Sequence, residues 1–361
     1  MTGPAIAATS DLVDAAWLTA ALRASGAIGD ASVTAVTKTP VGNGLVGDSF
    51  RFGLTYDRAE PGAPESVVGK FPAADPSSRA SGASFRLYLR EVSFYRQIAS
   101  TVGIITPKAH YAEIDEAGQD FTLIFEDMGP ARPGDQLTGC SVADAETAML
   151  EAAALHAPRW ADPSLLQLEW LNPSEELNAT FRAGLPMVLA AYHERYDGLL
   201  EHEFMKLVDR LPDVMPAFHA MDAGPRTVQH GDFRLDNILF DAQGGKKRMA
   251  TLDWQTVTCG PGLLDVSYFL SAGLPVDVRR AHEQDLVRRY HDELQRLGVR
   301  DYGWDACWRD YRRFAVHGVF MGVFSSIVVE RTERGDQLFL AMTRGGCAQA
   351  LDHGAFDFWQ S

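Results

Sequence analysis

The chain has 361 residues, of which 46% are hydrophobic and 22% are charged, a composition typical of a folded globular protein. Its net charge of −15 argues against a nucleic-acid-binding protein, because such a protein needs a basic surface that neutralises phosphates. The 4 cysteines form no Cys-x-x-Cys pair, so the sequence predicts neither a zinc site nor a disulfide framework.

The first third of the chain is predicted to form a small sheet with helices. A capped amphipathic helix is predicted over residues 10–26, because Ser10 and Asp11 precede a stretch with helical periodicity. A longer helix is predicted over about residues 82–100. Five segments rich in β-branched and aromatic residues predict an antiparallel sheet, and they are residues 32–40, 48–56, 65–72, 110–115 and 121–127.

The pattern changes after Asp127, where a connector rich in Gly and Pro precedes mostly helical periodicity. The clearest helical stretches are residues 142–160, 283–297 and 304–331. The short apolar pieces that predict small strands around a loop are residues 227–230, 237–240 and 249–254. We predict an α+β protein of two lobes that enclose a cleft. The N-lobe (residues 1–127) has a five-stranded antiparallel sheet with one helix, and the larger C-lobe (residues 128–361) is mainly helical.

The most informative motif is HGDFRLDN, followed by LDWQ, whose Asp253 lies sixteen residues after Asn237. Asp232 and Asn237 have the spacing of a kinase catalytic loop, in which the Asp accepts the proton of the substrate hydroxyl and the Asn binds Mg²⁺. Asp253 stands where a second metal-binding Asp is needed. Asp and Asn are common loop residues, but that alone does not explain the joint pattern. The motif predicts phosphoryl transfer, with Asp232 as the base and Asn237 and Asp253 as Mg²⁺ ligands.

Three N-lobe features fit a nucleotide site. Gly42, Gly44 and Gly47 form a G-x-G-x-x-G turn that leads into a strand, which favours a kinase-type flap over ATP instead of a Rossmann site. Lys70, at the end of an apolar strand, is a candidate phosphate contact, and Glu91 on the next helix is its candidate partner. The alternative explanations are a glycine-rich hairpin turn, a lysine at a strand end and a solvated helix face.

Other candidates lie at the lobe junction and beside the base. Glu126, Asp127 and Met128 close the fifth predicted strand, so we expect a hinge there that offers backbone groups to adenine. Arg234 is a candidate catalytic cation that reaches the transferring phosphoryl group, with a surface arginine as the alternative. Asp265 is expected to brace the catalytic segment by hydrogen bonds.

These motifs resemble those of known kinases. VQHGDFRLDNILF followed by LDWQ is similar to the signature of the aminoglycoside-phosphotransferase/choline-kinase-like superfamily, the small-molecule relatives of protein kinases. Within it, the chain most resembles the ecdysteroid-kinase-like branch. The segments that carry this second resemblance span roughly residues 40–270 and are VVGKFP, YLREVSFYRQIA, FTLIFEDM, LHAPRW and DWQTVTCGPGLLDVSYFL.

The resemblance implies a bilobal protein-kinase-like fold, ATP with Mg²⁺, and O-phosphorylation of a small molecule. It gives the residues above the roles of base, metal ligands and phosphate-positioning pair. Two departures from protein kinases matter: Trp254-Gln255 stands in place of Phe-Gly, and no Ala-Pro-Glu follows a phosphorylatable activation loop. We therefore expect a hydroxylated small molecule, and not a protein, as the substrate.

Three functions stay open at this point: a kinase for a small alcohol, an aminoglycoside antibiotic O-phosphotransferase, and a catalytically silent pseudokinase that binds nucleotide. Residues 187–222, where this family builds its acceptor pocket, include seven acidic and three basic residues. They could attract a cationic acceptor, but they equally fit a solvated helical face. The preference for ATP over GTP and the oligomeric state are not indicated.

We expect a cytoplasmic protein without a membrane partner. No apolar run is long enough to cross a bilayer, and the first residues lack the basic start of a signal peptide.

Overall fold

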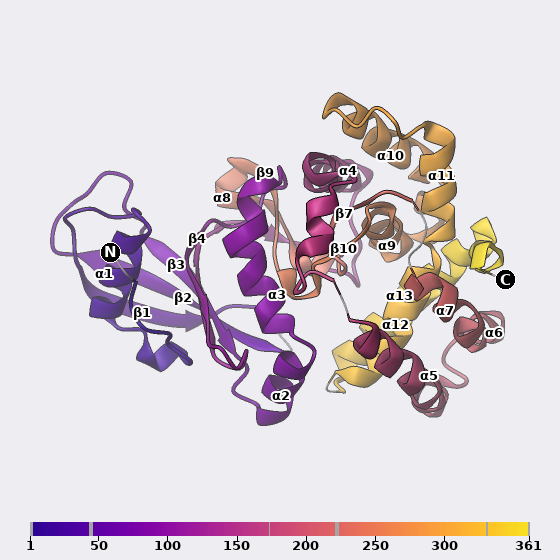
Figure 1. The fold of residues 1–361 in the computed structure, drawn as a ribbon, viewed down its shortest axis with the longest axis horizontal. Helices are drawn as coiled ribbons and strands as arrows, with labels where there is room; N and C mark the ends of the chain where they lie inside the picture. The colour runs from indigo at the N-terminus through magenta and orange to yellow at the C-terminus, as the bar shows by residue number, and fades with distance from the viewer. Residues whose placement is uncertain (1–2, 43–45, 173, 221–223, 330, 360–361) are drawn as a thin grey trace.

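The computed structural model describes residues 3–42, 46–172, 174–220, 224–329 and 331–359. The chain folds into two lobes, of which the N-lobe contains a five-stranded antiparallel sheet and the C-lobe is mainly helical (Figure 1). This architecture confirms the predicted α+β fold class. The division of the chain after Asp127 stays a prediction.

The N-lobe sheet consists of β1 (Val33–Pro40), β2 (Gly47–Tyr56), β3 (Ser66–Pro72), β4 (Ala109–Ile114) and β5 (Phe121–Glu126). Its strand order is β1-β2-β3-β5-β4, and all neighbouring strands are antiparallel. Successive side chains of a strand point to opposite faces. Val67 and Phe71 of β3 belong to the layer of α1 (Ala15–Ala24). Lys70 is out of phase with them and points to the other layer, which contains α3 (Leu87–Ser93).

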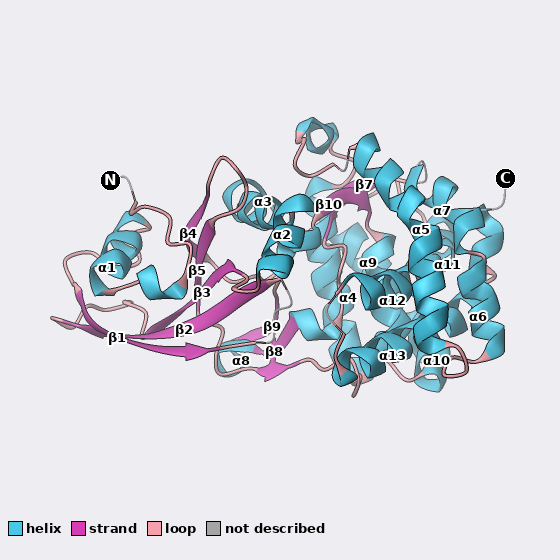
Figure 2. Ribbon diagram, turned by 90° about the horizontal axis from the view of Figure 1, so that it is seen from below, coloured by secondary structure: helices cyan, strands magenta, loops and turns pink. Residues whose placement is uncertain are grey.

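In place of the single helix predicted over residues 82–100, the structure has shorter helices. α2 (Pro76–Ser84) and α3 are separated by Arg86, whose backbone is left-handed (φ 57°). After α3 the chain continues as a π-helical turn (Phe94–Ile98). The sequence carries no warning of the break, because arginine has no preference for the left-handed region. Figure 2 shows α2 and α3 between the N-lobe sheet and the C-lobe helices.

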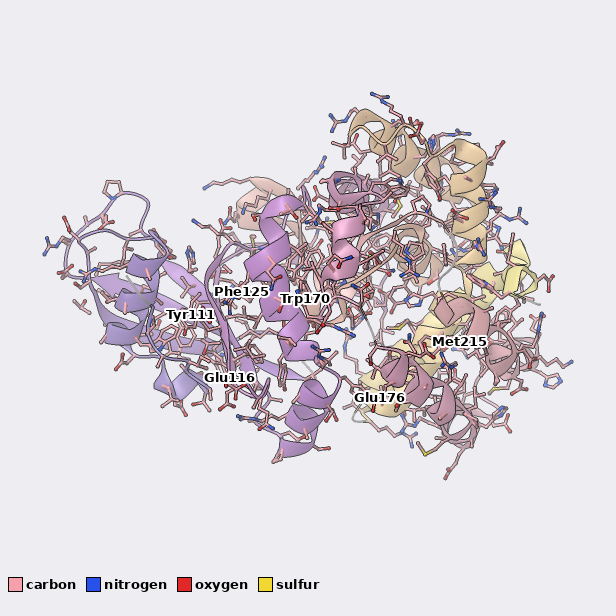
Figure 3. The ribbon with its side chains drawn as sticks, in the orientation of Figure 1. Tyr111, Glu116, Phe125, Trp170, Glu176 and Met215 are labelled. Carbon is pink, nitrogen blue, oxygen red and sulfur yellow. The ribbon has the colours of Figure 1, made fainter. Side chains whose placement is uncertain are left out.

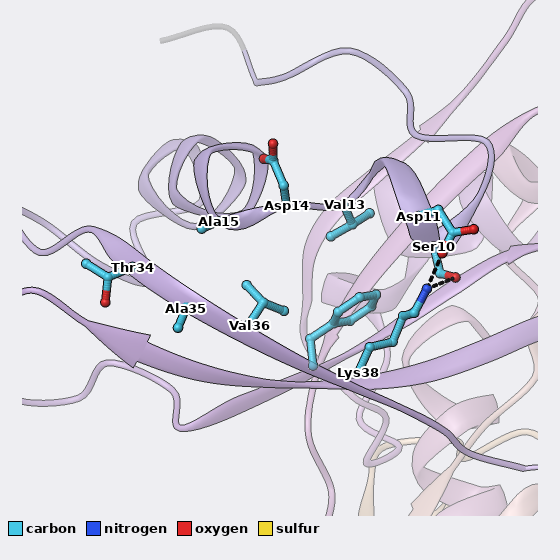
Figure 4. A pocket seen from close by; sticks show the side chains of 10 residues that line it. Ser10, Asp11, Val13, Asp14, Ala15, Thr34, Ala35, Val36 and Lys38 are labelled. Carbon is cyan, nitrogen blue, oxygen red and sulfur yellow. Dashed lines mark hydrogen bonds and ion pairs between the residues drawn. The ribbon is translucent and has the colours of Figure 1, made fainter.

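The first helix also starts later than predicted. Residues Ser10–Leu12 form a 3₁₀ turn, and it is Asp14 that caps α1 by accepting a backbone N–H of its first turn. Beside this turn lies a hollow of about 350 Å³ on the α1 face of the sheet (Figure 4). Lys38 crosses the hollow and bonds to Ser10 (3.0 Å) and Asp11. None of the predicted site residues lines it.

The C-lobe is built around α9 (Leu263–Gly273), which is buried along nearly its whole length. The other helices are α4 (Val142–His156), α5 (Glu175–Tyr196), α6 (His202–Asp209), α7 (Leu211–Ala220), α8 (Ala242–Gly245), α10 (Val276–Arg296), α11 (Trp304–Arg313), α12 (Val316–Val328) and α13 (Glu333–His353). The three helical stretches predicted for this lobe correspond to α4, α10, and α11 with α12. Within the described ranges, every helix is too short or too polar to span a bilayer.

Small strands frame the predicted catalytic loop. The strands are β6 (Arg132–Pro133), β7 (Arg226–Gln229), β8 (Ile238–Asp241), β9 (Lys247–Thr251) and β10 (Thr258–Pro261). β8 lies between β6 and β9, and β7 pairs with β10. β7, β8 and β9 correspond to the three predicted strands, whereas β6 and β10 were not predicted. The remaining 3₁₀ turns are residues 99–101, 157–159, 163–167, 235–237, 254–256 and 355–359.

Candidate active site

The loop between β7 and β8 is held by a buried carboxylate of α9. Asp265 has no exposed surface and accepts the backbone N–H groups of His230 (2.7 Å) and Gly231 (2.9 Å). Its Oδ2 lies 3.2 Å from the Nε2 of His156, whose Nδ1 lies 2.9 Å from the hydroxyl of Tyr290. Burial acts to raise the pKa of Asp265, but its hydrogen bonds and the nearby histidines lower it below its usual range. This is the bracing role expected for Asp265.

His230 connects the loop to the segment after β9. Its Nε2 lies 2.9 Å from the carbonyl oxygen of Leu252, and its Nδ1 accepts the backbone N–H of Asp232 (3.3 Å). Gly231 has a φ of 82°, and a Cβ on it would lie 2.6 Å from the carbonyl oxygen of Thr256. Only glycine fits this turn without strain. The two predicted catalytic segments, far apart in sequence, are therefore held side by side.

Three side chains point at the carboxylate of Asp232. The Nε of Arg234 lies 3.0 and 3.1 Å from its two oxygens. The Nδ2 of Asn237 donates to Oδ2 (2.9 Å), and the hydroxyl of Tyr268 donates to Oδ1 (3.0 Å). Arg234 also contacts Asp236 (2.6 Å), so the structure places it between two carboxylates instead of leaving it free for a phosphoryl group. The side chain of Asp232 is 20% exposed and can be reached by a small molecule.

Asn237 and Asp253 lie close together because the N–H of Leu252 donates to the carbonyl oxygen of Asn237 (2.8 Å). Asn237 uses its Nδ2 on the main chain and side chain of Asp232. Among the described residues, its Oδ1 has no hydrogen-bond partner. Asp253 has a φ of 62°, and a non-glycine residue in this region often marks a functional position. Its side chain is 40% exposed.

The chemistry of these two residues fits a magnesium ion. Amide and carboxylate oxygens are suitable ligands, and Mg²⁺ completes its shell with phosphate oxygens and water. In the part of the chain that the structure describes, no group of three or more His, Cys, Asp or Glu side chains is placed to hold a metal. The donor set of Asn237 and Asp253 therefore suits a cation that binds together with a phosphate-bearing substrate.

Lys70 joins the two lobes by ion pairs. Its Nζ lies 2.7 and 2.9 Å from the carboxylate oxygens of Glu91 and 3.1 Å from the Oδ1 of Asp253. Burial raises the pKa of Glu91 to about 7, because one ammonium group shared by two carboxylates does not offset the loss of water. Burial also acts to raise the pKa of Asp253, but the charge of Lys70 lowers it. Burial alone would lower the pKa of Lys70, yet the two carboxylates raise it.

The glycine-rich turn ends next to this cluster. Gly47 is so close to Lys70 that a Cβ on it would lie 3.5 Å from the lysine Cε and 3.0 Å from the carbonyl oxygen of Phe71. Gly42 has a φ of 74°, as a glycine turn allows. Gly44 lies outside the described residues. The positions of Gly42 and Gly47 suit a flap over phosphates held by Lys70.

The side chains of the predicted hinge are engaged in structural contacts. Glu126 pairs with Lys247 (2.9 Å), and Asp127 pairs with Arg51 (2.6 Å). The side chain of Met128 is buried, whereas its backbone N–H has no partner among the described residues. The carbonyl oxygens of Asp127 and Met128 accept hydrogen bonds from Gln243, so among these groups the N–H of Met128 is the one left to meet a ligand.

Tyr268 is a site residue that the sequence analysis did not single out. Tyr268 and Asp265 are three residues apart on α9, and residues at this spacing share a helix face. Because Asp265 was already expected to support the catalytic loop, the spacing could have pointed to Tyr268 as a second contact. The group that Tyr268 contacts is the carboxylate of Asp232. This partner depends on the conformation of the loop and could not be predicted from the sequence.

An aromatic stack couples the N-lobe to the DWQ segment. The ring of Phe94 stacks on Trp254, with centroids 3.8 Å apart and planes at 9°. The Nε1 of Trp254 donates to the hydroxyl of Thr106 (3.0 Å), and the tryptophan is completely buried. The ring that stands in place of the protein-kinase Phe therefore packs against the helical segment that follows Glu91.

Comparisons with known proteins show the family and the fold of the chain. The model of the ecdysteroid kinase-like family matches residues 42–300, which is more than half of the chain. Two solved structures with a similar fold are an ADP-bound aminoglycoside phosphotransferase, APH(2'')-Ib, and the GDP complex of aminoglycoside 2'-phosphotransferase-IIIa. The first has a TM-score of 0.50 and 14% identity, over 87% of this chain and 94% of that one. The second has a TM-score of 0.52 and 14% identity, over 92% and 97%.

At this identity the likeness concerns the fold, and it confirms the predicted bilobal, kinase-like architecture. Among curated proteins, acyl-CoA dehydrogenase family member 10 of Mus musculus is 36% identical over 67 residues. The match covers 17% of this chain and 6% of that protein. The matched segment is a small part of both proteins, and the name of the mouse protein refers to that protein as a whole.

Proposed function

Because the chain belongs to the ecdysteroid kinase-like family of small-molecule phosphotransferases, we propose that it transfers the γ-phosphate of ATP to a hydroxyl group of a small molecule, with Mg²⁺ as cofactor. One observation carries the proposal: Lys70 pairs with both Glu91 and Asp253 across the two lobes. Asp253 in turn lies beside the loop that presents Asp232 and Asn237. Phosphoryl transfer needs this combination of positioning and charge neutralisation.

Asp232 is the base in this reaction. Its carboxylate accepts the proton of the acceptor hydroxyl while the acceptor oxygen forms a bond to the γ-phosphorus, and the bond to the β-bridging oxygen breaks to release ADP. Tyr268, Asn237 and Arg234 hold the carboxylate in one orientation by hydrogen bonds. A fixed base within reach of the hydroxyl lowers the entropic cost of proton transfer.

The phosphates are held by residues of both lobes. Lys70 contacts phosphate oxygens, and Glu91 keeps its ammonium group in place. The turn from Gly42 to Gly47 covers the phosphates with backbone N–H groups. Asn237 and Asp253 hold Mg²⁺, which neutralises charge on the phosphates when it is bound. At the hinge formed by Glu126, Asp127 and Met128, the N–H of Met128 meets the nucleotide base.

Two other functions have less support. An aminoglycoside kinase would bind a polycation, and residues 187–222 are acidic. Two of these acids are already paired, however: Glu201 with Arg344 (3.0 Å) and Asp209 with His193 (2.7 Å). A pseudokinase would lack part of the catalytic set, whereas base, metal ligands and lysine are all present here.

A screen of ATP consumption over a chemically diverse library of alcohols, with aminoglycosides included, tests the proposed function. We expect at least one small alcohol to raise ADP production above the rate with water alone, and the phosphorylated product to be detected by mass spectrometry. Measurable Mg-ATP binding without turnover of any alcohol would favour the pseudokinase.

Asp253→Asn is expected to impair the use of Mg-ATP. Loss of one anionic ligand weakens metal binding, so the Mg²⁺ concentration at half-maximal rate should rise and kcat/KM for ATP should fall at least about 100-fold. A titration of Mg²⁺ at fixed ATP measures this. Asp241→Asn is the matched control, because Asp241 is also a left-handed Asp (φ 52°) but pairs with Arg132 on the surface. An unchanged Mg²⁺ requirement in Asp253→Asn would remove this residue from the metal site.

Tyr268→Phe is expected to lower kcat about tenfold, because one hydrogen bond to the charged base is lost. KM for ATP should stay within about twofold, since Tyr268 contacts no residue assigned to the nucleotide. Tyr196→Phe is the matched control: Tyr196 is also buried and donates to Asp336 (2.8 Å), which is not a residue of the loop. Steady-state kinetics distinguish the two variants, and equal kcat values for both would contradict a role of Tyr268 at the base.

A further inference from the structure

Two arginines at the start of α3 have no acidic partner. Arg86 precedes the helix and Arg90 lies within it, and neither side chain forms an ion pair or hydrogen bond with any described residue. The Nε of Arg90 is buried without a hydrogen-bond partner. Burial and the charge of Arg86 lower the pKa of Arg90 to about 10. In a chain of net charge −15, two neighbouring cations without a carboxylate suggest a missing anion.

Arg90 lies on the helix face that looks toward the C-lobe. Phe94 follows it by four residues and shares this face, and Gln97 lies in the π-helical turn that continues α3. Phe94 stacks on Trp254, and the Oε1 of Gln97 accepts the Nε1–H of Trp170 (3.1 Å). Figure 3 shows Trp170 beside α3. Arg90 thus lies at the junction of the lobes, whereas the next residue on the helix points about 100° away and meets the phosphate-binding lysine.

A row of aromatic rings leads from this junction to the proposed base. Phe85, next to Arg86, stacks on Phe181 of α5, with centroids 5.8 Å apart and planes at 19°. From Phe181 onward, successive ring centroids lie 5.1–6.5 Å apart. Tyr268 ends the row and donates to Asp232. The row consists of Phe181, Phe324, Phe320, His317 and Tyr268, and its three phenylalanines are partly exposed.

We propose that Arg86 and Arg90 form a subsite for a carboxylate or phosphate group of the acceptor. The acceptor is then an alcohol whose hydroxyl lies at Asp232, whose apolar body lies along the row of rings, and whose anionic end is bound by the two arginines. Guanidinium groups bind such anions by charge-assisted hydrogen bonds, and the side chain of Arg86 is exposed while that of Arg90 is partly exposed. Only the position of the hydroxyl rests on the proposed kinase function.

Binding of inorganic phosphate to the full chain tests the subsite without any transfer reaction. The nucleotide site is filled with ADP in the presence of EDTA, and calorimetry gives the phosphate affinity of the wild type, Arg86→Gln/Arg90→Gln and Arg300→Gln. Arg300 is the matched control, because it is an exposed arginine that also has no ion pair among the described residues.

We expect the wild type and Arg300→Gln to bind phosphate equally and the double variant to bind it at least about tenfold more weakly. Equal affinity in all three proteins, or no phosphate binding by any of them, overturns the subsite. If ADP does not bind in a separate titration with Mg²⁺, the proposed function fails, while the comparison of phosphate affinity between the wild type and the double variant still decides the subsite.

Alcohols of equal chain length that differ in one end group test the acceptor class. The acceptors are hydroxy carboxylates, hydroxyalkyl phosphates, diols and amino alcohols, and Mg-ATP is the phosphate donor in every assay. We expect the anionic compounds to exceed the diols at least about tenfold in kcat/KM, and this preference to disappear in Arg86→Gln/Arg90→Gln. The two anionic groups separate carboxylate from phosphate recognition. A preference for amino alcohols, or an anion preference that persists in the double variant, overturns the proposal.

Discussion

Asp232→Ala is expected to abolish phosphoryl transfer and to leave nucleotide binding largely intact. General base catalysis contributes about 10²–10⁴-fold to a rate, so kcat should fall by at least about 100-fold. KM for ATP should change little, because Asp232 is not among the residues assigned to the nucleotide or to Mg²⁺. Steady-state kinetics on the best alcohol of the screen, together with calorimetric titration of Mg-ATP, measure both quantities.

Two further variants make this prediction sharper. Asp232→Asn keeps the shape of the side chain but cannot take up the proton, so it should be as inactive as the alanine variant. Asp357→Ala serves as the control, because Asp357 is an exposed C-lobe acid (73%) that pairs with Arg210. If Asp232→Asn retained near-wild-type turnover, Asp232 would not be the base.

Lys70→Met is expected to reduce both activity and stability. Removing one preorganised charge at transferring phosphates costs about 10²–10³-fold in rate, so kcat/KM for ATP should fall by at least about 100-fold. The change also leaves Glu91, which is 1% exposed, without its cation. Breaking a buried ion pair typically costs about 3–5 kcal/mol of stability. Urea unfolding of both proteins measures this second effect.

A second substitution separates the two effects of Lys70→Met. In Lys70→Met/Glu91→Gln the buried negative charge is gone, so most of the lost stability should return while transfer stays absent. The single variant should also be more stable at acidic than at neutral pH. In the wild type, burial raises the pKa of Glu91 to about 7 although Lys70 lowers it, so loss of the lysine leaves the pKa raised. The folded state of the variant then binds the proton more tightly than the unfolded state, and its stability falls as the pH rises from the ordinary carboxyl range toward the raised pKa.

An active Lys70→Met/Glu91→Gln enzyme would show that the lysine serves folding alone. A double variant as unstable as Lys70→Met would show that the buried carboxylate is not the source of the instability.

Much of the fold could be predicted because local patterns and tertiary packing agree. The five N-lobe strands are rich in β-branched and aromatic residues, and each pairs with its neighbours within a few residues of the predicted bounds. The helix after β3 was predicted less well. Its break at Arg86 goes with contacts between the lobes, and no local sequence preference marks it. The stacking of Phe85 on Phe181 joins residues almost 100 positions apart, and sequence periodicity carries no signal for such a contact.

The candidate site divides in the same way. Asp232, Asn237 and Asp253 could be chosen from the sequence because their residue types and spacing are required together by one chemistry. Arg234 was chosen by proximity alone, and the structure places it on Asp232 and Asp236. Tyr268 was missed because a tyrosine inside an apolar helix is usually a core residue, and only the packing of α9 under the loop brings its hydroxyl to the base.

The sequence by itself determined the type of chemistry, since phosphoryl transfer requires a few residue types at short, fixed spacings along the chain. It also determined the α+β class, because strand and helix periods are local properties. Only the tertiary structure decided which groups surround the base and where cations lack a partner. Those features depend on contacts between α3, α5, α9 and the catalytic loop, which are set by packing over the whole chain. The proposal that Arg86 and Arg90 bind an anionic acceptor therefore rests on the fold and could not have come from the motif.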